Sequence, residues 1–552
     1  MIADIHITEK SFGDKTLMKD VKFSVDDGEK VGVVGRNGVG KSTLFGILSG
    51  KDTDYTGEVI FRRGITIATT AQEHHGLGEQ TVMSYILDGL PEYSKLKKII
   101  DEYPLTMGDN MRKIEEYTQA LERFDQKGFY QVEEKIEREL SNFQLDGYGN
   151  RRISSLSGGQ KRLVEIVKIM HSEAHLALID EPTNHMDYVA KQQFIDWMNS
   201  QPHQAMLIIT HDRDVLGQVD RIVEIKDGQA VSYRGNYDAY LKQNAQATTA
   251  GMNNFEQIEK RIVNLKQKVL DYQRLKEKSR NPGTIQKFKR LENEARAELE
   301  ELSEMEKPTF WIDKESVGQL DYKSAERYGK FKSRNIRLSM KDASSRSQHV
   351  LVRAENVAVG IGERILFEDV NIDLREGEAI EIRGRNGAGK TTLIRMILAS
   401  GKSFDGGPVL YSGDIFLDPQ VRIGVYEQEI DERYLSDPLE KAIEKLYMSR
   451  DLSISDTKIR QLLADYLFTD ADRMTPLARL SGGQKARFQI IAMLANDPQL
   501  LVLDEPTNHL DLPSIEELET ALAKYSGAIL YVSHDNYFRE KLGGKVVQIG
   551  AE

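Results

Sequence analysis

The sequence predicts an α/β protein in which two tandem domains of the same kind are joined by an α-helical hairpin. A set of short motifs in residues 1–243 recurs in the same order in residues 350–552, as expected for a duplicated domain. Between the copies, residues 252–308 carry apolar side chains three and four positions apart, interrupted by an Asn-Pro-Gly breaker, and this spacing is typical of two paired helices. We therefore expect a first domain at 1–243, a linker at 244–349 and a second domain at 350–552.

The composition is that of an ordinary globular protein. The 552 residues are 39% apolar and 29% charged, with a formal net charge of −12, and this length suffices for two to four domains. The absence of cysteine excludes disulfides, thiolate zinc sites and iron–sulfur clusters,. No apolar run approaches the roughly 18 residues of a membrane span, and the N-terminal residues lack the apolar segment of a secretion signal. We expect a cytoplasmic protein without a membrane domain.

Residues 29–47 predict a short buried strand, a glycine-rich loop and the start of a helix. The loop Gly35–Ser42 fits the pattern GxxxxGK[ST], in which backbone N–H groups point at phosphates. In this pattern Lys41 reaches the terminal phosphates and the hydroxyl of Ser42 ligates Mg²⁺. A plain glycine turn can also match the pattern, but the strand-loop-helix setting argues against that interpretation. The loop recurs at Gly384–Thr391.

Each half also contains an apolar strand that ends in two acids, followed by a later strand that ends in a lone histidine. We expect the Asp to hold Mg²⁺ through water, and the Glu lies where a base could polarise the attacking water. A single histidine at a strand end is usually structural, but here it can reach a γ-phosphate. These residues are Asp180, Glu181 and His211 in the first half and Asp504, Glu505 and His534 in the second.

The pentapeptide LSGGQ occurs twice, at 156–160 and at 480–484. A serine and two glycines ahead of a helix form a loop whose amides and helix N-terminus suit an anion. A simple helix cap would explain one copy, but it would not predict the recurrence. Two glutamines, Gln72 and Gln428, occupy matching places after the two phosphate loops.

The hairpin at 252–308 is strongly basic in its outer half. Between Lys260 and Arg290 there are eleven Lys or Arg residues against two acids. With about 26 residues per arm at roughly 1.5 Å rise, the hairpin projects on the order of 40 Å. A solvated coiled-coil face would explain lysine-rich helices in general. Because the cations gather near the tip and the acids near the base, we favour a phosphate backbone as the target.

The first half has about 32 more residues than the second between its glutamine and its LSGGQ motif. Helical periodicity near 94–127, with a turn at 104–110, predicts a small helical arm. Its charges are mixed, so both a protein surface and a nucleic acid stay open as its partner.

Taken together, the paired phosphate loops, LSGGQ motifs and acidic strands resemble the ATP-binding cassette superfamily over nearly all of 1–243 and 350–552. Three further features narrow this resemblance to the ABC-F class. These are the EPTNH string in both halves, the charged hairpin preceded by Tyr233–Tyr237, and the arm in the first half. Members of that class have no membrane domain and act on ribosomes.

The resemblance implies two cassettes that pair head to tail within one monomer, with ATP and Mg²⁺ between one phosphate loop and the other LSGGQ motif. It implies catalytic roles for Glu181, Glu505, His211, His534, Gln72 and Gln428, and metal binding by Ser42, Gln72, Asp180, Thr391, Gln428 and Asp504. The implied ATP-binding residues are Phe12, Gly35, Arg36, Asn37, Gly38, Val39, Gly40, Lys41, Ser42, Thr43, Ser157, Gly158, Gly159, Gln160, Gly384, Arg385, Asn386, Gly387, Ala388, Gly389, Lys390, Thr391, Thr392, Ser481, Gly482, Gly483 and Gln484. Phe12 would stack on adenine, but its counterpart is Ile361, so we expect weaker stacking in the second site.

The function that the resemblance implies is that of an ATPase that binds the ribosome in its ATP-bound closed state. The basic hairpin would reach rRNA and tRNA near the tRNA exit site and the peptidyl-transferase centre, modulate translation, and leave after hydrolysis. An antibiotic-protection role, which the family contains, stays open. One alternative is the ATPase subunit of a membrane transporter with two fused cassettes, which gives no reason for a basic hairpin. Another is a DNA-repair ATPase, which would commonly carry zinc cysteines or longer coiled coils.

Overall fold

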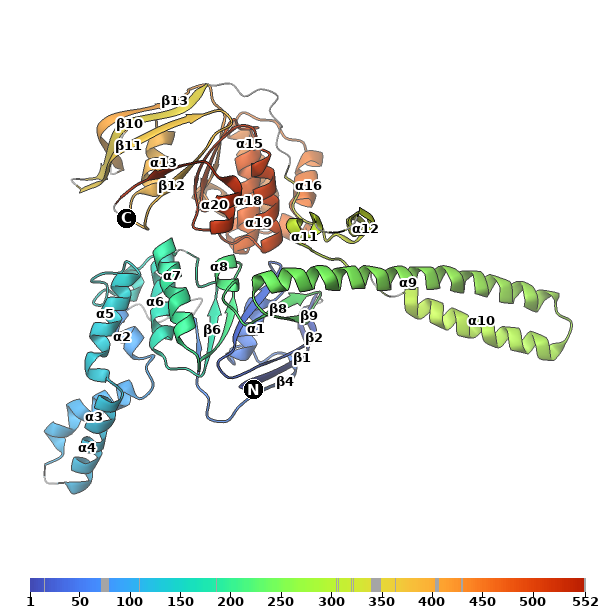
Figure 1. Cartoon of the computed structure of the whole chain (residues 1–552), viewed down its shortest axis with the longest axis horizontal. Coiled ribbons are helices and arrows are strands. Elements are labelled where there is room, and N and C mark those ends of the chain that lie inside the picture. Colours follow the sequence, from blue (N-terminus) through green and yellow to red (C-terminus); the bar gives the residue numbers. More distant parts are fainter. Residues whose placement is uncertain are drawn as a thin grey trace. The chain divides into compact units, whose positions relative to one another are not determined.

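The chain forms two compact units in the computed structural model. One unit comprises Met1–Tyr237 together with Ile336–Glu552, and the other comprises Asp238–Asn335 (Figure 1). We call Met1–Tyr237 the first lobe and Ile336–Glu552 the second lobe. None of the helices in the described ranges has the length and apolarity needed to cross a membrane. The structure describes residues 1–13, 15–70, 79–108, 110–184, 186–303, 305, 307–318, 320, 322–338, 349–362, 364–402, 407–427 and 430–550.

The first lobe is built on a six-stranded sheet of order β5-β6-β7-β3-β8-β9. All neighbouring strands are parallel except β9, which is antiparallel to β8. A second, antiparallel sheet has the order β2-β1-β4. The strands are β1 Ala3–Phe12, β2 Lys15–Val25, β3 Lys30–Gly35, β4 Thr56–Phe61, β5 Ile67–Thr69, β6 Leu176–Asp180, β7 Ala205–Ile209, β8 Arg221–Lys226 and β9 Gln229–Arg234.

Most helices of the first lobe pack against one face of the six-stranded sheet or form the arm. The arm consists of α3 and α4, which pair through Tyr103, whose hydroxyl donates to Glu116, and through Arg123, which donates to Glu92. The helix α3 continues through Pro104, so the turn is shorter than the expected 104–110. The helices are α1 Lys41–Leu48, α2 Val82–Leu87, α3 Tyr93–Thr106, α4 Met111–Gln126, α5 Val132–Asn142, α6 Gly158–His171, α7 Tyr188–Ser200 and α8 Arg213–Leu216.

The second lobe repeats this plan. Its parallel sheet has the order β14-β15-β16-β12-β17, and its antiparallel sheet has the order β11-β10-β13. The strands are β10 Val350–Ile361, β11 Arg364–Arg375, β12 Ala379–Arg383, β13 Pro408–Leu417, β14 Ile423–Tyr426, β15 Leu500–Asp504, β16 Ala528–Val532 and β17 Lys545–Gln548. The helices are α13 Lys390–Leu398, α14 Glu432–Leu435, α15 Leu439–Met448, α16 Asp456–Asp465, α17 Asp470–Arg473, α18 Gly482–Leu494, α19 Leu512–Ala523 and α20 Asn536–Leu542. The predicted duplication of an α/β domain is confirmed.

The central strands of each sheet are buried on both faces. Along β6, Leu176 and Leu178 belong to a cluster shared with the antiparallel sheet, whereas Ala177 and Ile179 belong to a cluster shared with the helices. Successive strand residues point to opposite faces of a sheet. A strand that must satisfy two cores is therefore apolar throughout, which explains the uninterrupted runs ahead of the acidic pairs.

The second unit holds the helical hairpin. Its arms are α9 Tyr237–Lys278 and α10 Pro282–Ser303, followed by α11 Lys314–Gly318 and α12 Tyr322–Phe331. Leu265, Val269 and Ala295 are buried along the seam between the arms, which is where the three- and four-residue spacing places them. The first arm begins at Tyr237 rather than near residue 252, because α9 is one continuous helix.

Truncating the seam should loosen the hairpin. Leu265 is 2% exposed and Val263 is 65% exposed on the same helix. We expect Leu265→Ala to lower the local stability of the hairpin by about 2 kcal/mol, because it opens a cavity in a small core. Val263→Ala should change it by less than about 0.5 kcal/mol. Amide hydrogen exchange along α9 and α10 measures both, and equal acceleration by the two variants would show that the seam is not what holds the arms together.

Candidate active sites

Each phosphate loop connects a buried strand to a helix, β3 to α1 in the first lobe and β12 to α13 in the second. The residue before each helix is a glycine with left-handed backbone, Gly40 at φ 107° and Gly389 at φ 99°. A Cβ on Gly40 would lie 2.8 Å from the side chain of Leu17. Both backbone conformation and packing therefore require glycine here.

The lysine of each loop is buried and points back into the loop. The ammonium of Lys41 donates to the carbonyls of Gly35 (2.6 Å) and Arg36 (3.2 Å). In the second lobe Lys390 donates to the corresponding carbonyls at 2.9 and 3.1 Å. Burial lowers the pKa of both lysines, and nearby carboxylates oppose that shift. Each loop thus encloses a cationic group at the place where the pattern expects phosphate.

The hydroxyl and the aspartate that we expect to hold Mg²⁺ lie together in both lobes. Ser42 donates to Asp180 at 3.2 Å, and Thr391 donates to Asp504 at 2.7 Å. Among the described residues no group of three or more His, Cys, Asp or Glu side chains could hold a metal by itself. The site offers one hydroxyl and one carboxylate, and Mg²⁺ commonly completes such a set with phosphate oxygens and water. The donor set therefore fits Mg²⁺ bound together with a nucleotide.

The glutamates that follow these aspartates are held in an unusual backbone conformation. Glu181 and Glu505 have φ values of 47° and 51°, a left-handed region that costs a non-glycine residue on the order of 1 kcal/mol. Their N–H groups still donate to the neighbouring strand, at Ile209 (2.7 Å) and Val532 (3.0 Å). Burial raises the pKa of Glu181 to about 8 and that of Glu505 to about 7. A carboxyl with a pKa near the working pH is suited to accept a proton.

Each glutamate faces the histidine predicted to accompany it. His534 Nε2 lies 3.3 Å from Glu505 Oε1, and the backbone N–H of His534 donates to the other carboxyl oxygen at 3.2 Å. In the first lobe His211 Nε2 lies 3.6 Å from Glu181 Oε1. Burial lowers the pKa of both histidines to about 3, so both are neutral near pH 7. A neutral imidazole can offer one N–H to an acceptor such as a phosphate oxygen.

The first phosphate loop lies against the second lobe. The backbone N–H of Asn37 donates to Asp511 at 3.1 Å, and its side-chain amide donates to the carbonyl of His509 at 2.9 Å. A Cβ on Gly483 would lie 2.1 Å from the amide nitrogen of Asn37. Among the described residues, the first loop and the second LSGGQ motif are therefore in direct contact. We call this arrangement the first site.

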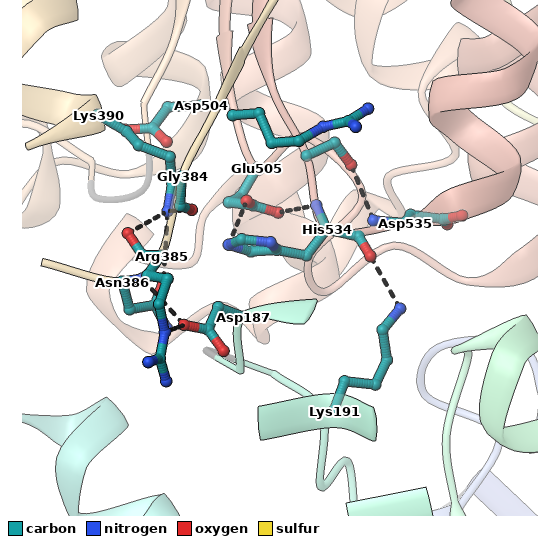
Figure 2. A network of polar contacts seen from close by, with 12 residues as sticks. Asp187, Lys191, Gly384, Arg385, Asn386, Lys390, Asp504, Glu505, His534 and Asp535 are labelled. Atoms are coloured by element: carbon teal, nitrogen blue, oxygen red, sulfur yellow. Dashed lines mark hydrogen bonds and ion pairs between the residues drawn. The ribbon is translucent and has the colours of Figure 1, made fainter. Parts of the chain in front are cut away.

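The reciprocal arrangement forms the second site. The backbone N–H of Asn386 donates to Asp187 at 3.1 Å, and Arg385 Nε lies 3.6 Å from the same carboxylate; Figure 2 shows both residues beside Asp187. A cavity of about 1130 Å³ lies between the second phosphate loop and the first LSGGQ motif, and it is large enough for a nucleotide. Its lining includes Ser157, Gly158, Gly159, Gln160, Asn386, Gly387, Gly389, Lys390, Thr391, Thr392, Asp504, Glu505 and His534.

The LSGGQ serines begin helices α6 and α18. Ser157 accepts from the N–H of Gln160 at 3.3 Å, and the Gln160 side chain accepts from the N–H of Ser157 at 2.9 Å. Ser481 and Gln484 form the same capping box. The helix cap and the anion site are thus compatible interpretations of one motif.

The remaining predicted site residues differ in where the structure places them. Phe12 is 57% exposed with the ammonium of Lys10 over its ring at 4.7 Å. Ile361 lines the cavity of the second site together with Arg364. Gln72 and Gln428 lie outside the described residues.

Sequence reasoning missed Asp187 and Asp511. Asp187 caps α7 by accepting from the N–H of Ala190 at 2.8 Å, and Asp511 caps α19 by accepting from the N–H of Ser514 at 3.1 Å. Burial acts to raise the pKa of Asp187, but the donated N–H groups and Arg385 outweigh it and leave that pKa lowered. The available signal was the repeated Asp that ends EPTNHMD and EPTNHLD.

The raised carboxyl pKa values predict how stability depends on pH. A Glu has an ordinary pKa of 4.5, against about 8 and 7 for Glu181 and Glu505 in the folded chain. Below pH 4.5 the two glutamates are protonated in both the folded and the unfolded chain, so their pKa shifts do not affect stability,. Above pH 8 they are ionised in both, and because ionisation is less favourable in the folded chain, the free energy of unfolding is lower there. The variant Glu181→Gln/Glu505→Gln should therefore be more stable than the wild type by several kcal/mol at pH 8.5, with a smaller difference at pH 5.

Urea unfolding at both pH values measures this effect. The exposed Glu58→Gln serves as control and should shift stability equally at both pH values. A double Gln variant that is less stable at pH 8.5 than the wild type would show that partners compensate the charge of the two carboxylates.

Comparisons with known proteins agree with this geometry. A family model described as ABC transporter matches residues 18–184 and 367–508. The putative ATP-binding protein YdiF of Bacillus subtilis is 30% identical over 100% of this chain and 80% of its own length. ABC transporter F family member 2 of Arabidopsis thaliana is 29% identical over 98% and 75%. The ribosome protection protein VmlR of Bacillus subtilis is 27% identical over 96% and 83%.

A solved structure shares the fold. It is the complex of the archaeal ribosomal stalk protein aP1 with the ribosome recycling factor aABCE1, with a TM-score of 0.59 and 16% identity, covering 99% of this chain and 87% of that chain. Since the family model matches both lobes and the relatives match from end to end, the chain is an ATPase that belongs to the ABC-F family of the ATP-binding cassette superfamily.

Proposed function

We propose that this ATPase associates with the ribosome when ATP holds its two lobes together, and that hydrolysis releases it. The observation that carries the proposal is the basic tip of the hairpin in a chain of net charge −12. The similarity to VmlR, a ribosome protection protein, supports the same partner. Ribosomal RNA presents the dense phosphate charge that such a tip would recognise.

In this proposal the two lobes close on ATP because each ATP site is made of residues from both lobes. Neither lobe alone surrounds a γ-phosphate, because each phosphate loop faces the LSGGQ motif of the other lobe. In the proposed roles, Lys41 and Lys390 bind phosphate, and the pairs Ser42–Asp180 and Thr391–Asp504 hold Mg²⁺. When bound, Mg²⁺ neutralises phosphate charge. Glu181 and Glu505 would orient and deprotonate water, with His211 and His534 donating to the γ-phosphate. Loss of that phosphate removes the link between the lobes.

Several basic side chains near the turn of the hairpin are not engaged in ion pairs within its described residues. Of the eleven basic side chains between Lys260 and Arg290, three pair within the hairpin, since Arg261 donates to Glu298, Lys276 donates to Glu292 and Arg290 lies 3.5 Å from Glu294. Within the described part of the hairpin, four exposed cations around the turn make no ion pair, and these can neutralise RNA phosphates. They are Lys278, Arg280, Lys287 and Lys289.

The aromatic residues of the hairpin do not favour base readout. Tyr272 and Phe288 stack on each other with ring centroids 6.4 Å apart, which fits packing in the seam. We therefore propose contacts with rRNA and tRNA backbones near the tRNA exit site and the peptidyl-transferase centre. Such contacts would modulate translation, with antibiotic protection as one form of that effect.

Blocking hydrolysis should trap the ribosome-bound form. The variant Glu181→Gln/Glu505→Gln keeps the size of both side chains but removes the base, so turnover should fall by at least about 100-fold. We expect it to co-sediment with ribosomes in ATP and not in ADP, whereas the wild type co-sediments weakly in both. Enrichment with membranes instead would favour the transporter alternative, and enrichment with DNA would favour a repair function.

Reversing the charge of the tip should weaken ribosome binding without affecting ATP turnover. In the trapped background, Lys287→Glu/Lys289→Glu/Arg290→Glu should lower affinity by about tenfold or more. It should also reduce the slope of log affinity against log salt by about 2 to 3, because up to three phosphate contacts are lost.

The matched control carries the same charge change on three exposed lysines of the second lobe, Lys402, Lys441 and Lys524. If this control weakens binding equally, net charge rather than the tip is responsible. If ATP turnover of the tip variant in the otherwise wild-type chain collapses, the tip is structural.

A further inference from the structure

A buried lysine joins segments of both lobes. Lys191, on α7 of the first lobe, is 5% exposed. Its ammonium lies 2.7 Å from Asp214 and 3.2 Å from Asp212 of its own lobe. It also donates to the main-chain carbonyl of His534 in the second lobe at 2.8 Å, as Figure 2 shows. One cationic group thus bridges two lobes.

The segments that Lys191 joins begin with the two active-site histidines. We call His211–Asp214 and His534–Tyr537 the histidine loops. They also contact each other directly, since the side chain of Asn536 donates to Asp214 at 2.8 Å and Arg213 lies 3.8 Å from Asp535. A movement of either loop therefore changes the surroundings of the other, with the ammonium of Lys191 at the junction.

The junction is not symmetric between the lobes. The position that corresponds to Lys191 in the second lobe holds Ile515, and the counterparts of Arg213 and Asp214 are Asn536 and Tyr537. The first lobe thus supplies the cations. Burying charge is a weak source of stability compared with apolar packing of similar volume, and Ile515 shows that the position accepts an apolar side chain. A role in holding the two lobes together is therefore not enough to explain a buried lysine at position 191.

We infer that Lys191 is a positioning residue that makes hydrolysis at each ATP site depend on the state of the other. A γ-phosphate that draws one histidine toward it displaces that histidine's loop, and the shared ammonium passes the displacement to the second loop. This is a coupling free energy between two sites, carried by named contacts. The inference rests on the proposed roles of His211 and His534 but not on ribosome binding.

The test uses the purified full chain without ribosomes and measures steady-state ATP hydrolysis against ATP concentration. Lys191→Met removes the charge and leaves two carboxylates facing it, so Lys191→Met/Asp214→Asn provides a second variant with less uncompensated charge. Lys30→Met is the matched control. Lys30 is likewise buried, and its ammonium donates to the carbonyls of Gly28 (3.0 Å) and Gln201 (2.6 Å) within the first lobe.

We expect a Hill coefficient above 1 for the wild type and for Lys30→Met, and about 1 for both Lys191 variants. Blocking the first site with Glu181→Gln should slow turnover at the second site by about fivefold or more in the wild-type background, and by less than about twofold when Lys191→Met/Asp214→Asn is also present.

A wild-type Hill coefficient of 1 would overturn the inference, as would a coefficient that the Lys191 variants leave unchanged or that Lys30→Met lowers equally. If neither Glu181→Gln nor Glu505→Gln slows hydrolysis, the assignment of the active sites fails and the inference falls with it. A failure of ribosome binding would leave these measurements unaffected.

Discussion

A hydrogen bond from each phosphate loop to an aspartate of the opposite lobe is the constraint on which the rest of the candidate active sites depends. Asn37 donates its backbone N–H to Asp511, and Asn386 donates its own to Asp187. Each aspartate is fixed because it also caps the first turn of a helix, so its carboxylate has little freedom to turn away. The phosphate loops are therefore held against the LSGGQ motifs of the opposite lobe, and both sites become shared between lobes.

Features of the two glutamates that suit them to the proposed chemistry lower the stability of the folded chain. Glu181 and Glu505 occupy left-handed backbone at the ends of buried strands and carry raised pKa values, while their histidines are kept neutral. The strained backbone and the raised glutamate pKa values oppose folding near pH 7, and the backbone hydrogen bonds to Ile209 and Val532 hold the strained residues in place,. Because the same combination occurs in both lobes, its cause is the shared role of the position rather than local accident.

The sequence predicted the fold where local signals suffice. Runs such as Leu176–Asp180 are apolar because their strands face two cores, and the hairpin seam around Leu265 follows helical spacing. The true start of the hairpin at Tyr237 was missed because the first turns of α9 bury polar residues. Asn244 is 5% exposed and donates to the carbonyl of Trp311 at 2.8 Å. The contact of Lys191 with His534 joins residues 343 positions apart, and no periodicity encodes such a pair.

The duplicated lobes carry the same proposed reacting groups but differ around them. Phe12 is replaced by Ile361 beside the second site, Lys191 by Ile515 at the junction of the histidine loops, and the arm α3–α4 belongs to the first lobe. Identical acids, lysines and histidines would give two equivalent sites in a symmetric dimer. In a single chain each site has its own surroundings, so the order in which the sites bind and hydrolyse ATP can be set by residues that never touch the nucleotide.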